Sequence, residues 1–191
     1  GSVAFKGHGF QVHVGHNKPT SRGHVHALSG DIKQHPEILF NYLQTEHDRQ
    51  GFRDCVHLTR EIMCQPAMDE FRGDVIQPDP QVQTDEQIDA FVRESVDSAY
   101  HPAGTCKIGA DNMAVVDKDL RVHGIANLRV IDSSVFPTVP NGNLNAPTMM
   151  LAERGSDLIK GCDIKPSSPA DNYIDKQWQE RQKEGVPLRP A

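Results

Sequence analysis

The sequence has no excess of basic residues, no long apolar run and no secretory signal. Its net charge of −6 argues against binding to nucleic acid or to an anionic membrane through a basic surface. No apolar stretch approaches the roughly 20 residues of a membrane-spanning helix. We therefore expect a cytoplasmic protein, and peripheral attachment to the inner membrane stays open as an alternative.

Closely paired cysteines are also lacking. None of the four cysteines forms a Cys-x-x-Cys pair, so a zinc knuckle or dithiol centre has no support, and scattered cysteines suit a reducing compartment. The ten histidines offer another metal possibility, because His24 and His26 would lie on the same face of a strand. A solvated strand face is the commoner origin of such alternation. We expect no metal site.

The 191 residues that are present suffice for one sizeable domain, and two amphipathic helices stand out. The first is predicted over residues 46–64, with Thr45 as its cap. The second is predicted over residues 85–99. It begins with a capping box at 84–87, and Pro102 stops it near residue 100. The chain opens on Gly-Ser rather than Met, which we interpret as a processed or excised piece.

Short β-rich runs flank these helices. "FQVHVG" (10–15) alternates as a half-buried strand does, and "HVHAL" (24–28) is predicted to pair with it in antiparallel fashion. Residues 31–44 show little periodicity and are predicted as loop with a short turn. Farther along, "AVVD" (114–117) is β-rich, and "LRVIDSS" (128–134) is typical of a buried strand that leads into a loop.

The last helix is predicted over residues 147–160. It has proline in its first turn and ends at Gly161, which is the usual asymmetry of helix ends. Residues 163–191 are rich in proline, serine and charge. They predict an extended tail that packs locally, if at all, through Tyr173 and Trp178.

His101 is the first candidate for chemistry. Carbonyls of a last helical turn carry partial negative charge, which raises the basicity of an imidazole placed there. Pro102 holds the backbone of His101 extended, and a rigidly held imidazole suits general-base work. A His-Pro pair after a helix is more often a plain stop signal, and a lone histidine specifies little.

Polar residues before the last helix form a second candidate site. Asn143 and Asn145 lie beside a helix start, whose unpaired N–H groups and positive dipole end can stabilise a phosphate, an alkoxide or a reduced flavin. A simple helix cap is the commoner role for such an asparagine. Asp132, at the end of "LRVID", can bind a ribose or ribityl hydroxyl or can cap a turn.

Taken together, these segments resemble a known family. "YHPAGTCKIG", "VVDKDLRVHGIANLRVIDSSVFP" and "GNLNAPTMMLAERGSDLIKG" resemble the C-terminal signature of the glucose–methanol–choline oxidoreductases, flavoenzymes that oxidise alcohols. The upstream segments "HGFQVHVGHNKPTSRGHVHAL" and "LTREIMCQPAMDEFRG" resemble the bacterial choline-oxidising members more than the family at large. The resemblance covers about residues 8–161.

One family motif is missing. The Gly-x-Gly-x-x-Gly turn that holds the ADP part of FAD does not occur, and "GTCKIG" has the wrong glycine spacing. The resemblance therefore implies the C-terminal part of such an enzyme, separated from its N-terminal FAD-binding half. We expect this piece alone to bind FAD weakly or not at all and to be inactive.

The resemblance also implies a role for each candidate residue. His101 would take the hydroxyl proton of the substrate, and Asn143 would hydrogen-bond the substrate oxygen. Asn145 and the helix start at Pro147 would face the flavin, and Asp132 would hold the FAD chain beyond the ring.

Choline is the implied substrate and betaine aldehyde its product, with further oxidation to glycine betaine as a second step. A membrane electron acceptor is a further implied partner. The side chains that would hold the quaternary ammonium are not recognisable, and the family's substrate-binding acid is expected in the missing half. Another alcohol as substrate, or a binding module without catalysis, are the alternatives.

The expected fold is α+β. A partial antiparallel sheet from the substrate domain of the family would carry both predicted helices on one side. Residues 1–114 would form a portion of that domain that includes His101. Residues 115–161 would return, as a strand and a helix, to the FAD-binding domain, and 162–191 would form the tail. Apolar surface left by the missing half would favour self-association.

Overall fold

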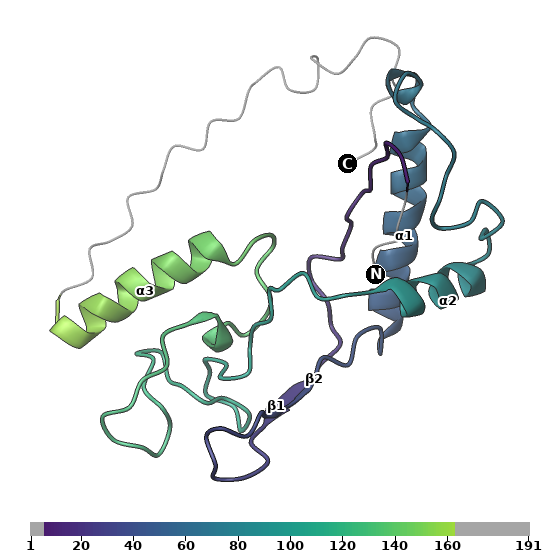
Figure 1. The fold of residues 1–191 in the computed structure, drawn as a ribbon. Coiled ribbons are helices and arrows are strands. Elements are labelled where there is room, and N and C mark those ends of the chain that lie inside the picture. The colour runs from purple at the N-terminus through teal and green to yellow at the C-terminus, as the bar shows by residue number, and fades with distance from the viewer. Residues whose placement is uncertain (1–5, 163–191) are drawn as a thin grey trace.

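The computed structural model describes residues 6–162, and within them the architecture is α+β (Figure 1). The elements, in chain order, are β1 (His24–His26), β2 (Glu37–Leu39), α1 (Glu46–Met63), the 3-10 helix η1 (Pro66–Met68), α2 (Asp85–Ser95), the 3-10 helix η2 (Ser133–Val135) and α3 (Asn145–Lys160). The two strands form an antiparallel sheet, so the predicted fold class is confirmed. The predicted tail, with Tyr173 and Trp178, lies outside the described residues.

The start of α1 is as predicted. The Thr45 side chain accepts a hydrogen bond from the backbone N–H of Asp48, and the helix ends one residue before the predicted boundary. The capping box of α2 is also confirmed: Thr84 accepts from the N–H of Gln87, and the Gln87 side chain accepts from the N–H of Thr84. Both caps depend on neighbours in sequence, which is why the sequence predicts them.

The predicted end of α2 at residue 99 is wrong, because the helix stops at Ser95. Val96 already has extended backbone, with ψ of 134°. Beyond it, local side chains compete for the backbone donors: Asp97 accepts from the N–H of Ser98 at 2.6 Å, and Ser98 accepts from the N–H of Tyr100 at 3.0 Å. Such local bonds replace the helical ladder.

The predicted strand pairing is also wrong. Residues 10–15 form no strand, and β1 pairs instead with β2, inside the stretch that was expected to be loop. Gly23 makes this pairing possible, since a Cβ there would lie 1.8 Å from the carbonyl oxygen of Leu39. The partner of β1 is thus set by a close backbone approach that hydrophobic alternation does not reveal.

Two separate apolar clusters stabilise the described chain. The first joins α1 and α2 with the loop before α1, and its buried members are Leu43, Val56, Ile88 and Val92. The second joins α3 to the loop-rich segment before it, and its buried members are Val116, Leu120, Val135 and Leu151. Figure 1 shows α1 and α2 gathered at one end and α3 at the other, with the connecting segment between them.

The second cluster forms without the predicted strand at 128–134. That segment contributes an isolated bridge between Arg121 and Arg129 and then turns into η2. "AVVD" likewise supplies only isolated bridges at Val116. The 3-10 turn forms because the carboxylate of Asp132 accepts from the N–H of Ser134 at 2.8 Å.

Helix α3 begins at residue 145, two residues before the predicted start, and ends as predicted at Gly161 in the left-handed conformation (φ 68°). It packs closely on the preceding segment. A Cβ on the buried Gly155 would lie 2.4 Å from Cγ2 of Ile131, so only glycine fits this crossing without a shift. This contact, with Leu151 in the cluster, fixes the direction of α3.

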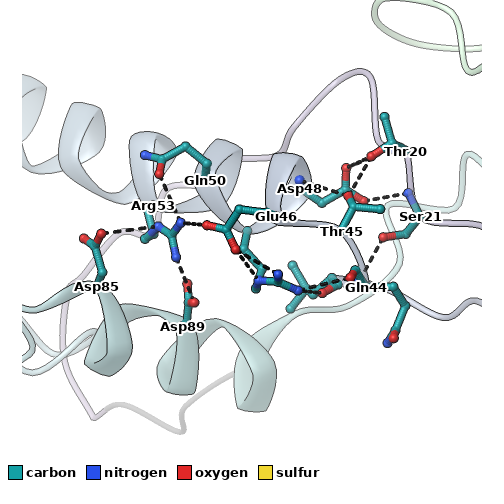
Figure 2. A network of polar contacts seen from close by, with 12 residues as sticks. Thr20, Ser21, Gln44, Thr45, Glu46, Asp48, Gln50, Arg53, Asp85 and Asp89 are labelled. Atoms are coloured by element: carbon teal, nitrogen blue, oxygen red, sulfur yellow. Dashed lines mark hydrogen bonds and ion pairs between the residues drawn. The ribbon is translucent and has the colours of Figure 1, made fainter.

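A network of polar contacts holds α1 against α2 and against the segment before β1 (Figure 2). Arg53 of α1 is 6% exposed and forms ion pairs with Glu46 of its own helix and with Asp89 of α2. Asp48 is 2% exposed and accepts hydrogen bonds from Thr20 and Ser21. These are the two buried charged side chains of residues 6–162. Ion pairs offset the burial of Arg53, whose Nε alone has no hydrogen-bond partner among the described residues, and hydrogen bonds offset the burial of Asp48.

Many large apolar side chains of the described chain remain exposed. Val25, Ile38, Leu39 and Phe40 of the β1–β2 ribbon are each 43–54% exposed. A two-stranded ribbon is marginally stable by itself, and apolar exposure on this scale is typical of a surface that another segment covers. None of the helices within residues 6–162 combines the length and the apolarity needed to span a bilayer.

Candidate functional site

His101 lies in an extended connection rather than at a helix end. Helix α2 stops at Ser95, six positions earlier, so the argument that last-turn carbonyls raise the basicity of His101 is wrong. The residue before it, Tyr100, adopts the left-handed conformation with φ of 60°, and its side chain is 83% exposed. His101 itself is exposed, so its ring is accessible to another segment or a ligand.

The segment after His101 is fixed against η2. The N–H of Cys106 donates to the carbonyl of Ser134 at 2.9 Å, and the N–H of Ile108 donates to that of Val135 at 2.8 Å. Gly104, with φ of 91°, approaches the carbonyl of Phe136, because a Cβ there would lie 3.2 Å from that oxygen. Two stretches about thirty residues apart in sequence therefore lie side by side.

This pairing brings the stretch that follows His101 beside the stretch that contains Asp132. Asp132 is exposed and caps η2 through its bond to Ser134, which is the structural role that the sequence left open. One oxygen of its carboxylate accepts that bond, and hydrogen bonds within residues 6–162 leave the second oxygen available to a ligand hydroxyl.

The amino end of α3 has no side-chain cap. Its N-cap residue is Leu144, so Asn143 and Asn145 are not the ordinary caps that the sequence made the commoner expectation. Both asparagine side chains are exposed. Pro147 has no N–H, and the N–H of Thr148 bonds to the carbonyl of Leu144 at 2.9 Å. An uncapped helix start of this kind can accept an anion at its first N–H groups.

The predicted site residues are only partly drawn together. Backbone hydrogen bonds join the segments that follow His101 and Asp132, whereas no hydrogen bond among the described residues joins His101 to Asn143 or Asn145. Two surface hollows of about 450 and 460 Å³ lie elsewhere, one along residues 121–129 and one along 76–94. Four of the five candidate residues are exposed and Pro147 is half-buried, and neither hollow is lined by any of them.

Sequence reasoning missed the buried contact that holds the segment before β1 against α1. Asp48 lies in the first turn of α1, and its buried carboxylate also anchors the chain at Thr20 and Ser21. Burial acts to raise the pKa of Asp48, but hydrogen bonds from Ser21 and Thr20 together outweigh it and hold the pKa well below the usual range. The sequence signal for this contact is weak, because residues 16–23 have only the polar composition, with proline and glycine, that is typical of a turn.

Comparison with known proteins gives a consistent picture. The sequence profile described as GMC oxidoreductase matches residues 19–152. An "Oxygen-dependent choline dehydrogenase" of Vibrio vulnificus is 58% identical over 191 residues, which cover 99% of this chain and 34% of that protein. One of the same name from Photobacterium profundum is 56% identical, covering 100% of this chain and 34% of its own length. The chain thus spans about a third of the length of the curated relatives it matches.

Solved structures agree. Pyridoxine 4-oxidase from Mesorbium loti is similar with a TM-score of 0.72 at 31% identity, over 78% of this chain and 29% of that one. An FAD-dependent oxidoreductase from Chaetomium thermophilum gives a TM-score of 0.72 at 32% identity, over 76% of this chain and 26% of that one. The fold of this chain is thus shared with parts of two proteins of known structure.

Proposed function

The chain belongs to the GMC oxidoreductase family, and from this premise we propose that it forms the His101-bearing C-terminal part of an FAD-dependent enzyme that oxidises choline to betaine aldehyde. The observation that carries the proposal is 58% identity to a choline dehydrogenase over 99% of this chain. Further oxidation of the aldehyde to glycine betaine would be a second turnover of the same kind.

The residues present fit a flavin at one edge. The uncapped start of α3 and the exposed carboxamides of Asn143 and Asn145 provide hydrogen-bond donors where a reduced ring edge would be negative. In the proposed site, Asn145 and the turn at Pro147 would hold that edge, and Asp132 would accept a hydrogen bond from a hydroxyl of the FAD chain. Bound FAD supplies the acceptor for the hydride from the substrate carbon.

His101 and Asn143 would act on the substrate oxygen. An imidazole nitrogen of His101 takes the hydroxyl proton, and the Asn143 carboxamide donates a hydrogen bond to the oxygen as negative charge develops there. The exposed ring of His101 and its fixed flanking segment support this role. A base held in position contributes through orientation as well as through its pKa.

The two apolar clusters support a division of the chain into two structural portions. We assign residues 1–114 to the substrate-binding portion and 115–161 to the segment that contributes to the FAD-binding domain. The cluster between α1 and α2 lies in the first, and the cluster under α3 lies almost wholly in the second.

A complemented enzyme tests the proposal. The chain would be joined to, or coexpressed with, the part of the Vibrio vulnificus relative that it does not cover. A yellow product whose flavin absorbance is bleached anaerobically by choline supports the proposal. In this protein, His101→Ala lowers turnover by about 100-fold or more, the usual effect of removing a positioned base. His57→Ala, on the exposed face of α1, is the matched control and leaves turnover unchanged.

The outcomes of this experiment distinguish a wrong substrate assignment from a wrong assignment of the catalytic activity. Faster turnover of pyridoxine or an aromatic alcohol than of choline would leave the family chemistry in place and replace the substrate. A colourless product with His101 intact would point instead to a binding module without catalysis. Oxygen consumption without added quinone would favour oxygen, as the relatives' name states of them, over a membrane acceptor.

A further inference from the structure

The β1–β2 ribbon gathers three metal-ligand side chains on one face, away from the proposed active site. His24 and His26 are two positions apart in β1, so both side chains point to the same side of the ribbon. In the register of the pair, His26 is directly opposite Glu37 of β2. Cross-strand partners share a face, and Glu37 therefore joins the two imidazoles.

The distances within this cluster suit an ion better than a direct hydrogen bond. Nε2 of His24 lies 3.4 Å from Oε2 of Glu37, and Nδ1 of His26 lies 3.8 Å from the same oxygen. A normal N–H···O hydrogen bond spans about 2.7–3.2 Å. Two ligands that each lie about 2.0–2.1 Å from a tetrahedral zinc ion are separated by roughly 3.4 Å. The His24–Glu37 distance, a long hydrogen bond, equals this second value, and the His26–Glu37 distance is somewhat longer.

The backbone under the cluster is held in place before any ion binds. The two imidazole rings are stacked, with centroids 4.1 Å apart and planes at 18°, so they would turn about their side-chain bonds to point a nitrogen lone pair each at one ion. One potential ligand atom from each of the three residues falls within 4.8 Å of the others. At one end of the ribbon the Asn41 side chain donates to the carbonyl of Arg22 at 2.9 Å, which extends the strand pairing. An ion here would need little rearrangement of the backbone.

We propose that His24, His26 and Glu37 form a binding site for a divalent transition-metal ion of the zinc class, with water in the fourth position. Two imidazoles and a carboxylate are ligands that Zn²⁺ accepts, and three protein ligands leave one position open. The ion would link β1 to β2 and so stabilise their pairing, since they form only a two-stranded ribbon within residues 6–162. The proposed metal site does not depend on the oxidoreductase chemistry.

A second histidine cluster in the described chain provides the discriminating comparison. His16, His47 and Asp48 also place ligand atoms close together. The Asp48 carboxylate already accepts bonds from Thr20 and Ser21, and Nε2 of His16 lies 2.9 Å from Nε2 of His47 in a hydrogen bond. The ligand atoms of the His16–His47–Asp48 cluster are thus already in short hydrogen bonds, whereas the contacts among His24, His26 and Glu37 are longer.

Zinc titration of the full 191-residue chain against a chromophoric chelator tests the proposal, after removal of metal with EDTA. His26→Gln and Glu37→Gln should each weaken Zn²⁺ binding by about tenfold or more, because loss of even an outer-shell partner costs about 10- to 100-fold. His47→Gln and His57→Gln are controls that should leave the affinity within about twofold.

Three results would overturn the site. The first is an unchanged Zn²⁺ affinity in both ribbon variants, and the second is an equal loss of Zn²⁺ affinity in all four variants. The third is a loss of Zn²⁺ affinity in His47→Gln alone, which would assign binding to the other cluster. All the ribbon ligands are partly or largely exposed, so the variants are expected to fold, and the helical circular dichroism of each verifies this. An imidazole shift of His24 and His26 in NMR spectra on adding one equivalent of Zn²⁺ gives an independent readout.

Discussion

Replacing Asp48 by Asn gives a direct test of how the segment before β1 is held. Oδ1 of Asp48 accepts from the N–H and the hydroxyl of Thr20 at 2.7 and 3.0 Å, and Oδ2 accepts from the N–H of Ser21 at 2.8 Å (Figure 2). Asparagine keeps one oxygen acceptor but presents an NH₂ group to a second donor. One charged bond is lost, one buried donor is unpaired, and the remaining bonds lose their charge.

The expected loss of stability follows from these bonds. A hydrogen bond to a charged group contributes about 1.5–3 kcal/mol and an unpaired buried donor costs about 1–3 kcal/mol, and these terms overlap. Asp48→Asn should therefore lower the free energy of unfolding by about 2–4 kcal/mol near pH 7. With a urea m-value of about 2 kcal/mol/M, the midpoint of the helical circular dichroism transition should fall by about 1–2 M.

The stability difference between wild type and Asp48→Asn should depend on pH. The pKa of Asp48 is lowered in the folded chain, so its contribution is complete above the unfolded pKa of about 3.9 and is lost as pH falls through the folded pKa. The gap between wild type and Asp48→Asn should therefore shrink below about pH 4, because a protonated aspartic acid resembles the amide. Asp54→Asn, on the exposed side of α1, is the matched control and should show little gap at any pH.

Two results would refute this reasoning. Equal urea midpoints near pH 7 would show that the three bonds contribute nothing net. A gap that stays constant down to about pH 2.5 would show that the charge of Asp48 is not what stabilises the segment. Hydrogen exchange at the Thr20 and Ser21 amides provides the local measurement, since both should lose protection in the variant.

Three further predictions follow from single features. Ile88→Ala, at a side chain with 0% exposure between α1 and α2, should lower the free energy of unfolding by about 2–5 kcal/mol in urea titrations, and a loss below about 1 kcal/mol would contradict the cluster. Gly23→Ala should break the β1–β2 pairing, because its Cβ would meet the carbonyl of Leu39, and unchanged exchange protection of Val25 would contradict this. FAD should show no micromolar affinity for the isolated chain by calorimetry, since the phosphate-binding turn is absent, and a clear micromolar isotherm would refute that expectation.

Local chemistry explains which elements the sequence determined. The capped start of α1 at Thr45, the capping box at Thr84 and the glycine end of α3 at Gly161 all depend on residues within one helical turn. The end of α2 was missed although its cause is also local. Hydrogen bonds from Asp97 and Ser98 compete with the helix there, and the apolar period alone does not reveal them.

The sequence by itself also determined the family, because the motifs around His101, Asp132 and Asn143 are contiguous and need no folding to be recognised. Tertiary structure alone decided the partner of β1, the burial of Asp48 against Thr20, and the arrival of Glu37 opposite His26. Each of these joins residues that are 11 to 28 positions apart, and such contacts depend on a close backbone approach or a strand register. Hydrophobic period and capping signals report only on neighbours along the chain, so they carry no information about those pairings.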